Sequence, residues 1–281
     1  MNKFLSIWAK AIFMFAIAAL LQSCGGSDTD VSDDPQNDTL NPELNEKKKL
    51  IENAFYKIPS PAELYIFLKE EKVHFNKNLT NPTGNASKYN TTVKKAINFG
   101  VYASDLAYCS LFEQNQQTLD YYAVAKQLGD ELGIVEGFDE SVAERIDKNI
   151  NNSDSLYKIT SEAYWDAYTY LESQEKTSVL PFISTGSWLE SVHIAIESVE
   201  NFASDDEVVA RVVEQELLLE NLLGFLNTCD KDENLDPIIK DLKELMVVFE
   251  DLYNNEDVLI TKPQFDAISS KVASIRKQFV E

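Results

Sequence analysis

The sequence predicts an all-α protein with a single globular domain of about nine to ten helices, packed as a helical bundle or as stacked helical hairpins. Three observations predict this fold class. Glycine and proline are scarce, with 9 and 8 residues in a chain of 281. No Asn-Gly or Asp-Gly pair marks a hairpin turn, and no segment alternates apolar and polar residues as a strand does. Apolar residues instead recur at helical spacing through most of the chain.

The expected helices follow one another with short links. The first covers about residues 43–56, and the second begins at Ser60-Pro61-Ala62-Glu63, where Ser60 caps the helix and Pro61 takes its first position. The others are expected over residues 90–113, 116–132, 139–149, 154–173, 176–201, 205–226, 236–252 and 261–279. Pro181 and Gly186 are expected to kink or split the helix over 176–201.

The last of these helices has the clearest pattern. Its apolar residues form one stripe at i, i+3, i+7, i+10 and i+14, made of Phe265, Ile268, Val272, Ile275 and Phe279. Thr261 and Pro263 mark its start. A stripe of this kind must be buried against other helices, so we expect the C-terminal helix to be part of the core.

The first 23 residues have the layout of a bacterial lipoprotein signal peptide. Lys3 and Lys10 give a basic start, an apolar run extends from Ala11 to Leu21, and Cys24 follows Leu-Gln-Ser. The apolar run is too short for a membrane-spanning helix, which needs about 20 residues. An ordinary secretory signal would leave the position of Cys24 unexplained. Leu-x-Ser-Cys resembles the lipobox, so we expect residues 1–23 to be removed and Cys24 to carry palmitate-type acyl chains.

Residues 24–42 are predicted to form an acidic, disordered tether. They contain five aspartates and neither lysine nor arginine. A segment with low hydrophobicity and charge of one sign does not bury enough surface to become ordered. The aspartates close behind Cys24 resemble the export signal of Bacteroidota lipoproteins that are displayed on the cell surface. The expected location is therefore the outer membrane, facing outward, with a periplasm-facing orientation as the alternative. Residues 43–281 form the globular domain.

The formal net charge of the chain is −22 at pH 7, and removal of residues 1–23, which hold two lysines and no acid, takes it to −24. Nucleic-acid binding requires clustered lysine and arginine, so this balance argues against a nucleic-acid partner. It also opposes adsorption on anionic lipid. The membrane contact is therefore expected through the acyl chains on Cys24 alone.

Four segments of the chain resemble an uncharacterised family of all-α Bacteroidota lipoproteins. They are Ile58-Pro-Ser-Pro61, Lys95–Tyr108, Asn149–Ser155 and Thr185–Glu190. The resemblance is strongest over residues 58–199 and covers about half of the chain. It implies a lipoprotein with an all-α domain, and it implies no activity and no catalytic residue.

The sequence carries few of the motifs that mark enzymes. It has no Gly-x-Ser-x-Gly elbow, Walker loop, His-Glu-x-x-His or Cys-x-x-Cys motif. Two Glu-x-x-His pairs are present, Glu71 with His74 and Glu190 with His193. On a helix, residues at i and i+3 share a face, and two such pairs resemble the ligands of ferritin-like di-metal proteins. A carboxylate-bridged di-metal enzyme is thus one alternative. The pairs are also explained by chance in so acidic a chain.

Asp105 is the most unusual polar residue, because it lies in a helix that is apolar almost all round. It shares a stripe with Asn98 and Tyr102. A buried carboxylate must be paired or hydrogen-bonded. The first interpretation is an internal polar network, with a Tyr hydroxyl, Lys94 or Arg145 as the partner of Asp105. The second is the floor of a ligand pocket, ringed by the aromatic residues Tyr102, Tyr108 and Trp188.

Two further features leave alternatives open. Cys109 and Cys229 could form a disulfide in an exported protein, although Cys109 is also explained as a small core residue. Gly100 and Gly186 each precede an aromatic residue inside an apolar helix. A duplicated helical hairpin would explain this similarity, but the identity between the two segments is low.

Taken together, these features favour a membrane-anchored binding or accessory module that is not catalytic and needs no cofactor. The expected partner is a glycan or a protein, met at an exposed surface rich in Tyr and Trp. Larger all-α glycan-binding lipoproteins of the same phylum suggest this by analogy. The alternatives are the di-metal enzyme and a purely structural envelope protein.

Overall fold

The computed structural model describes residues 61–134, 140–174, 177–255 and 259–281. Over these residues the chain forms α-helices and short 3-10 turns and no β-strand, which confirms the predicted fold class. The signal peptide, Cys24, the tether and the helix expected over 43–56 lie outside the described residues.

Ten α-helices follow in chain order. They are α2 (Pro61–Glu70), α3 (Thr92–Leu111), α4 (Asn115–Leu132), α5 (Glu140–Lys148), α6 (Ser153–Ser173), α7 (Leu180–Glu197), α8 (Glu207–Val213), α9 (Gln215–Thr228), α10 (Leu235–Glu250) and α11 (Lys262–Val280). The 3-10 turns are η1 (Thr83–Lys88), η2 (Thr177–Val179) and η3 (Asp251–Asn254).

Two of the predicted helices differ from the structure. Pro181 does not kink a longer helix, because it occupies the first turn of α7, where its missing N–H costs no hydrogen bond. Gly186 lies inside α7, which continues through it. The helix expected over 205–226 is two helices, with Glu214 as the residue between α8 and α9.

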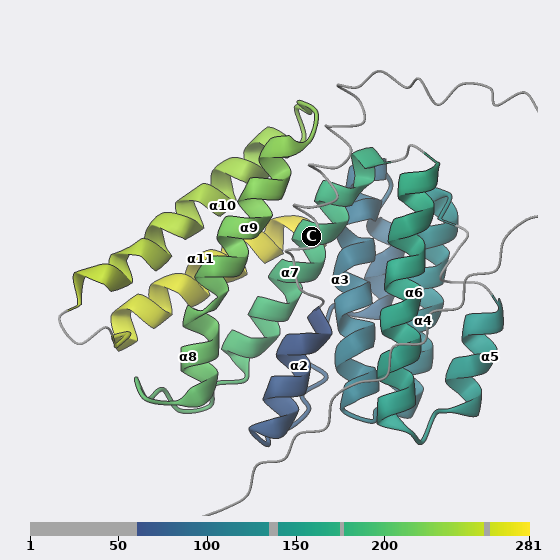
Figure 1. Cartoon of the computed structure of the whole chain (residues 1–281), viewed down its shortest axis with the longest axis horizontal. Helices are drawn as coiled ribbons and strands as arrows, with labels where there is room; N and C mark the ends of the chain where they lie inside the picture. Colours follow the sequence, from purple (N-terminus) through teal and green to yellow (C-terminus); the bar gives the residue numbers. More distant parts are fainter. Residues whose placement is uncertain (1–60, 135–139, 175–176, 256–258) are drawn as a thin grey trace, which may run out of the picture. The chain divides into compact units, whose positions relative to one another are not determined.

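Helices α3 and α7 form the centre of the domain (Figure 1). They pack against each other, and α3 also contacts α2, α4 and α6, while α7 also contacts α2, α8, α9 and α11. Every α7 residue from Leu180 to Ile196 is buried except His193. This burial follows from the sequence, because Glu190 is the only acidic residue in that range. Such an apolar helix is stable only when other helices surround it.

Helix α11 packs against α7, α3 and α10 through its apolar stripe. All five residues of the stripe are buried, as the sequence predicts. The helix begins at Lys262, and the Gln264 side chain accepts a hydrogen bond from the Thr261 backbone N–H at 3.0 Å. This cap fixes the start of the helix and therefore which of its faces meets the core.

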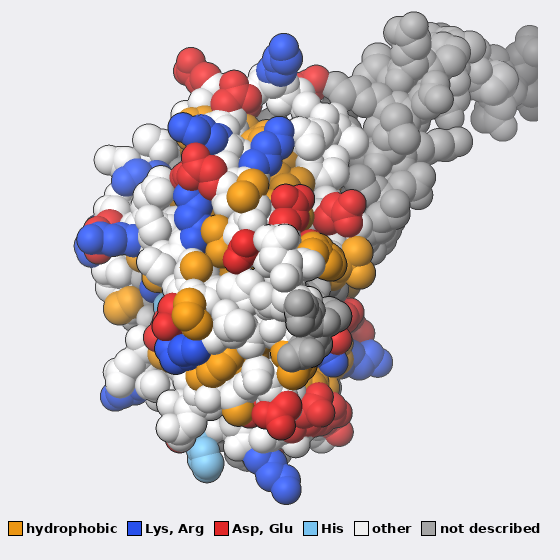
Figure 2. Space-filling view, turned by 90° about the vertical axis from the view of Figure 1, so that its left-hand side faces the viewer, with side chains coloured by type: hydrophobic (Ala, Val, Ile, Leu, Met, Phe, Trp, Pro, Cys, Tyr) orange, Lys and Arg blue, Asp and Glu red, His pale blue; other side chains and the backbone are white. Residues whose placement is uncertain are grey.

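The surface is polar and mixed in charge. On the face in Figure 2, acidic side chains are interspersed with lysine and arginine, with small apolar areas between them. The large apolar side chains that are exposed are Leu217, Val247, Tyr253 and Leu259. None of the helices in the described part of the chain is both long and apolar enough to cross a membrane.

Candidate functional site

Helices α3 and α7 are in direct backbone contact at two glycines. A Cβ atom placed on Gly100 would lie 2.1 Å from the carbonyl oxygen of Ile183, and one placed on Gly186 would lie 2.0 Å from that of Ile97. These distances are far below van der Waals contact, so only glycine fits at either position. The two glycine motifs of the sequence therefore have a packing reason, because they face each other across one helix crossing.

The crossing brings two buried carboxyl groups together, Asp105 of α3 and Glu190 of α7. Both residues are 0% exposed. Arg276 of α11 binds Glu190 with two hydrogen bonds of 2.6 Å, from Nε to Oε2 and from Nη2 to Oε1. The same guanidinium donates to the Leu79 carbonyl at 3.2 Å. One side chain thus ties α11 to α7 and to the segment between α2 and η1.

The buried group contains two acids and one base, so one acid must hold a proton. Asp105 Oδ2 accepts a hydrogen bond from the Asn81 N–H at 3.1 Å, and Oδ1 has no donor among the described residues. Burial raises the pKa of Asp105 well above its usual value, and the charge of Glu190 raises it further. Burial also raises the pKa of Glu190, but Arg276 opposes this rise. We conclude that Asp105 carries the proton and donates it to Glu190.

Asn98 belongs to the same buried network, as the sequence predicts. Its side-chain amide donates to the Phe279 carbonyl at 2.8 Å and to the Lys94 carbonyl at 2.9 Å. Its oxygen faces the Asn81 amide at 3.5 Å. Asn98 therefore links α3 to the last turn of α11.

Tyr102 and Tyr108 are also buried, and their hydroxyl groups bind backbone atoms. Tyr102 donates to the Pro82 carbonyl at 2.9 Å, and Tyr108 accepts from the Asn76 N–H at 3.0 Å. Both bonds hold the segment between α2 and η1 against α3. These contacts favour the interpretation as a polar network over that as a pocket floor, because the groups are used inside the fold.

The partners that the sequence suggests for Asp105 are wrong. They were a Tyr hydroxyl, Lys94 or Arg145, whereas the structure places the Asn81 N–H and Glu190 at Asp105. Arg145 instead pairs with Glu162 at the surface. The cation of the network, Arg276, comes from a helix far along the chain, which periodicity in α3 does not reveal.

We expect Asp105→Asn to be at least as stable as the wild type at pH 7. Asn donates an N–H where protonated Asp105 donates an O–H, and it does not ionise. Because the folded pKa of Asp105 is raised, the stability that its proton provides is complete below the unfolded pKa of about 3.9 and is lost as pH rises through the folded pKa. The advantage of the variant should therefore grow from pH 4 to pH 7.

Urea unfolding at the two pH values measures this difference. At pH 4 the two proteins should agree within about 1 kcal/mol. A variant that is less stable than wild type by the same amount at both values would mean that Asp105 is ionised in the fold.

The two Glu-x-x-His pairs do not share a helical setting. Helix α2 ends before Glu71, so Glu71 and His74 lie on an exposed, non-helical segment. In the other pair, Glu190 is bound to Arg276, and the pKa of His193 is lowered to about 3 by burial and by the charge of Arg276. Among the residues that the structure describes, no group of three or more His, Cys, Asp or Glu side chains could hold a metal ion. The structure thus offers no support for the di-metal alternative.

The two cysteines of the described domain are free thiols. Cys109 is fully buried, as expected for a core residue. Burial raises the pKa of its thiol, so it is held in the unreactive protonated form.

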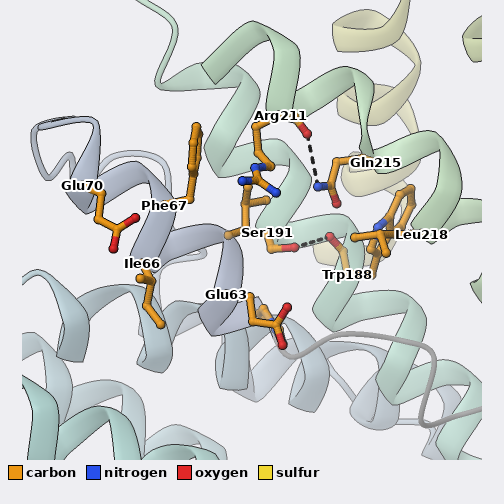
Figure 3. Close-up of a pocket in the computed structure, with 11 residues that line it drawn as sticks. Glu63, Ile66, Phe67, Glu70, Trp188, Ser191, Arg211, Gln215 and Leu218 are labelled. Carbon is orange, nitrogen blue, oxygen red and sulfur yellow. Dashed lines mark hydrogen bonds between the residues drawn. The ribbon is translucent and has the colours of Figure 1, made fainter. Parts of the chain in front are cut away.

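Trp188 lies in another place, a pocket of about 290 Å³ between α2, α7, α8 and α9, which we call the Trp188 pocket. Figure 3 shows Trp188 beside Gln215, with Arg211 and Phe67 across from them and Glu63 on a further wall. The apolar side chains that complete the lining are Leu64, Ile66 and Leu218.

The Trp188 indole has an unused hydrogen-bond donor. The residue is 4% exposed, and its Nε1 has no acceptor among the described residues. Gln215, which is 3% exposed, uses its own amide on the Arg211 carbonyl at 3.3 Å. A buried donor without a partner costs about 1–3 kcal/mol, so the Trp188 N–H is unusual in a folded domain.

Arg211 is the one cation of the Trp188 pocket. Its guanidinium lies 4.4 Å from the centre of the Phe67 ring, in a cation–π contact. It also pairs with Glu214 at 3.0 Å, but that side chain is 63% exposed, so water weakens the pair. Arg211 is therefore held in place by the aromatic ring, with donors left for another group.

The polarity of the Trp188 pocket changes from inside to outside. The buried and half-buried groups, Trp188 and Arg211, are donors, whereas Glu63 and Glu70 are exposed acceptors on α2. Apolar side chains lie between them. A site with this arrangement suits a small molecule that has an acceptor at one end, donors at the other and an apolar part between.

Of the residues in these two sites, the sequence pointed to Asp105, Glu190 and Trp188 but missed both arginines. A signal for Arg276 was present, because a lone acid in the apolar helix α7 requires a cation somewhere in the chain. Arg211 had no comparable signal, since a basic residue on a short amphipathic helix usually faces solvent.

The fold and the two sites define the chain as an all-α helical domain with a buried ion-pair network and a small pocket beside it. No protein-family model, curated protein or solved structure matches the chain.

Proposed function

We propose that this protein is a non-catalytic binding module, lipid-anchored at the outer membrane through Cys24, and that the Trp188 pocket is its ligand site. The unpartnered Trp188 N–H carries the proposal. A buried donor that lowers stability is explained if a ligand supplies its acceptor. The Asp105 network does not suit this role, because its groups bind one another inside the core.

The size of the Trp188 pocket limits the ligand. At about 290 Å³ it is at the lower end of small-molecule sites, which span roughly 300–1,000 Å³. It therefore suits a single ring, such as one sugar residue of a glycan chain that continues into solvent. Phe67 and Trp188 provide aromatic surface for a sugar ring, and Arg211, Gln215 and the rim glutamates provide polar groups for its substituents.

The test is a screen of sugars and short glycans by saturation-transfer NMR and titration calorimetry, with Trp188→Phe as the variant. We expect the variant to keep its fold and melt close to wild type, because loss of an unpaired donor offsets the smaller ring. Ligands found for the wild type should lose about tenfold or more in affinity.

Trp165→Phe is the matched control, because it removes the same ring from α6, outside the pocket. It should leave affinity unchanged. If no glycan binds the wild type, the chain is better explained as a structural protein of the envelope.

The lipid anchor has its own test. Cys24→Ser should abolish incorporation of labelled palmitate and move the protein from the membrane fraction to the soluble fraction, because serine is not a substrate for acylation through sulfur. Three acyl chains, at about 0.8 kcal/mol per buried CH₂, would hold the wild type firmly. Membrane retention of the serine variant without label would contradict the anchor and leave the Trp188 pocket unaffected.

A further inference from the structure

We propose that the Trp188 pocket selects an acetamido sugar, a neutral hexose unit that bears an N-acetyl group. This inference rests on the proposed function. It goes further by naming the substituent that the pocket recognises.

The buried end of the pocket requires an acceptor on the ligand. The indole N–H of Trp188 is a donor only, and so is the guanidinium of Arg211. Trp188 is 4% exposed, and its N–H has no acceptor among the described residues. A hydroxyl could accept from it, but a carbonyl oxygen has two lone pairs and no hydrogen of its own to satisfy there.

The charges around the pocket favour a neutral acceptor over a carboxylate. Glu63 and Glu70 line the pocket, and the whole chain carries a formal charge of −22. Both terms repel an anion. Arg211 already has a counter-charge in Glu214 at 3.0 Å, so it needs no anion from a ligand.

The remaining groups of an N-acetyl sugar match the rest of the lining. Its methyl group suits the apolar side chains of Leu64 and Leu218, and its ring face suits Phe67. Its hydroxyl groups are donors for the exposed carboxylates of Glu63 and Glu70. A peptide also offers carbonyls, but it brings only one N–H per residue to a rim with two carboxylates.

The experiment compares ligands that differ in one substituent. N-acetylglucosamine, glucose, glucosamine and glucuronic acid share a ring, and a capped alanine dipeptide presents the same carbonyl and methyl without it. Each is titrated into the full chain, purified in a detergent that has no sugar head group. We expect N-acetylglucosamine to bind about tenfold more tightly than every other probe, and Trp188→Phe to remove most of this preference.

The other outcomes overturn the inference and separate it from the proposed function. Tighter binding of glucuronic acid would make this an anion site, and tighter binding of the dipeptide would make it a peptide site. In both cases the pocket would remain a ligand site. Equal affinity of the Trp188→Phe variant for N-acetylglucosamine, with Trp165→Phe as control, would show that the indole N–H is not used. Failure of every probe at millimolar concentration would also refute the acetamido preference, whereas the wider glycan screen decides whether the pocket binds any ligand.

Discussion

Replacing Arg276 with Met is expected to destabilise the domain by about 3–5 kcal/mol, because Glu190 would then be fully buried without a cation. Met keeps the length of the apolar stem and removes both 2.6 Å bonds to Glu190. The bond to the Leu79 carbonyl is lost as well. Urea unfolding at pH 7, followed by circular dichroism, measures the change in the free energy of unfolding.

Lys271→Met provides a matched control on the same helix. Lys271 pairs with Glu244 at 2.6 Å, but Glu244 is 50% exposed, so the loss should stay below about 1 kcal/mol. The double variant Glu190→Met with Arg276→Met should recover at least half of the stability lost in the single variant, because no buried charge remains. Similar losses for Arg276→Met and Lys271→Met would mean that the buried pair is not the stabilising contact described here.

The second large effect is expected at the helix crossing. Gly186→Ala should destabilise the domain by about 3 kcal/mol, at the upper end for overpacked sites. The new methyl group would lie 2.0 Å from the carbonyl oxygen of Ile97, and a backbone atom in a central helix does not move aside as a flexible side chain does. Gly100→Ala should act in the same way. Thermal and urea unfolding measure both variants.

Gly224→Ala is the control for these substitutions. Gly224 is an exposed residue of α9, and a Cβ there would meet no atom within 4 Å. Because alanine favours the helix over glycine, this variant should gain about 0.5–1 kcal/mol. Tolerance of alanine at both Gly100 and Gly186 would contradict the close contact of α3 and α7.

Local patterns predicted the helices well, because each pattern depends on neighbours within one or two turns. The stripe of α11 and the all-round apolar character of α3 translated directly into burial. The break at Glu214 was missed, because the apolar spacing of α8 continues into α9 without a proline or glycine to mark it. Spacing also misled at Glu71 and His74, since it assumes a helix and the chain turns at Lys72, whose φ is 62°.

The sites could be predicted only in part, because their partners are distant in sequence. Glu190 and Arg276 are 86 residues apart. The Trp188 pocket combines α2 and α7 with α8 and α9, and nothing in the separate segments announces that Arg211 will lie over Phe67. A single sequence indicates which residues need a partner more readily than which residues provide it.

The ion pair at Glu190 also has a consequence for the order in which the domain is completed. Arg276 follows α3, α7 and the segment between α2 and η1 in the chain. A ribosome or an export channel that releases the chain from its N-terminal end therefore delivers these elements first and their cation last. Until α11 arrives, closing α7 against α3 would bury Glu190 alone, at a cost of about 3–5 kcal/mol. The core is thus discouraged from closing early, which keeps the chain open for transport until its last helix is available.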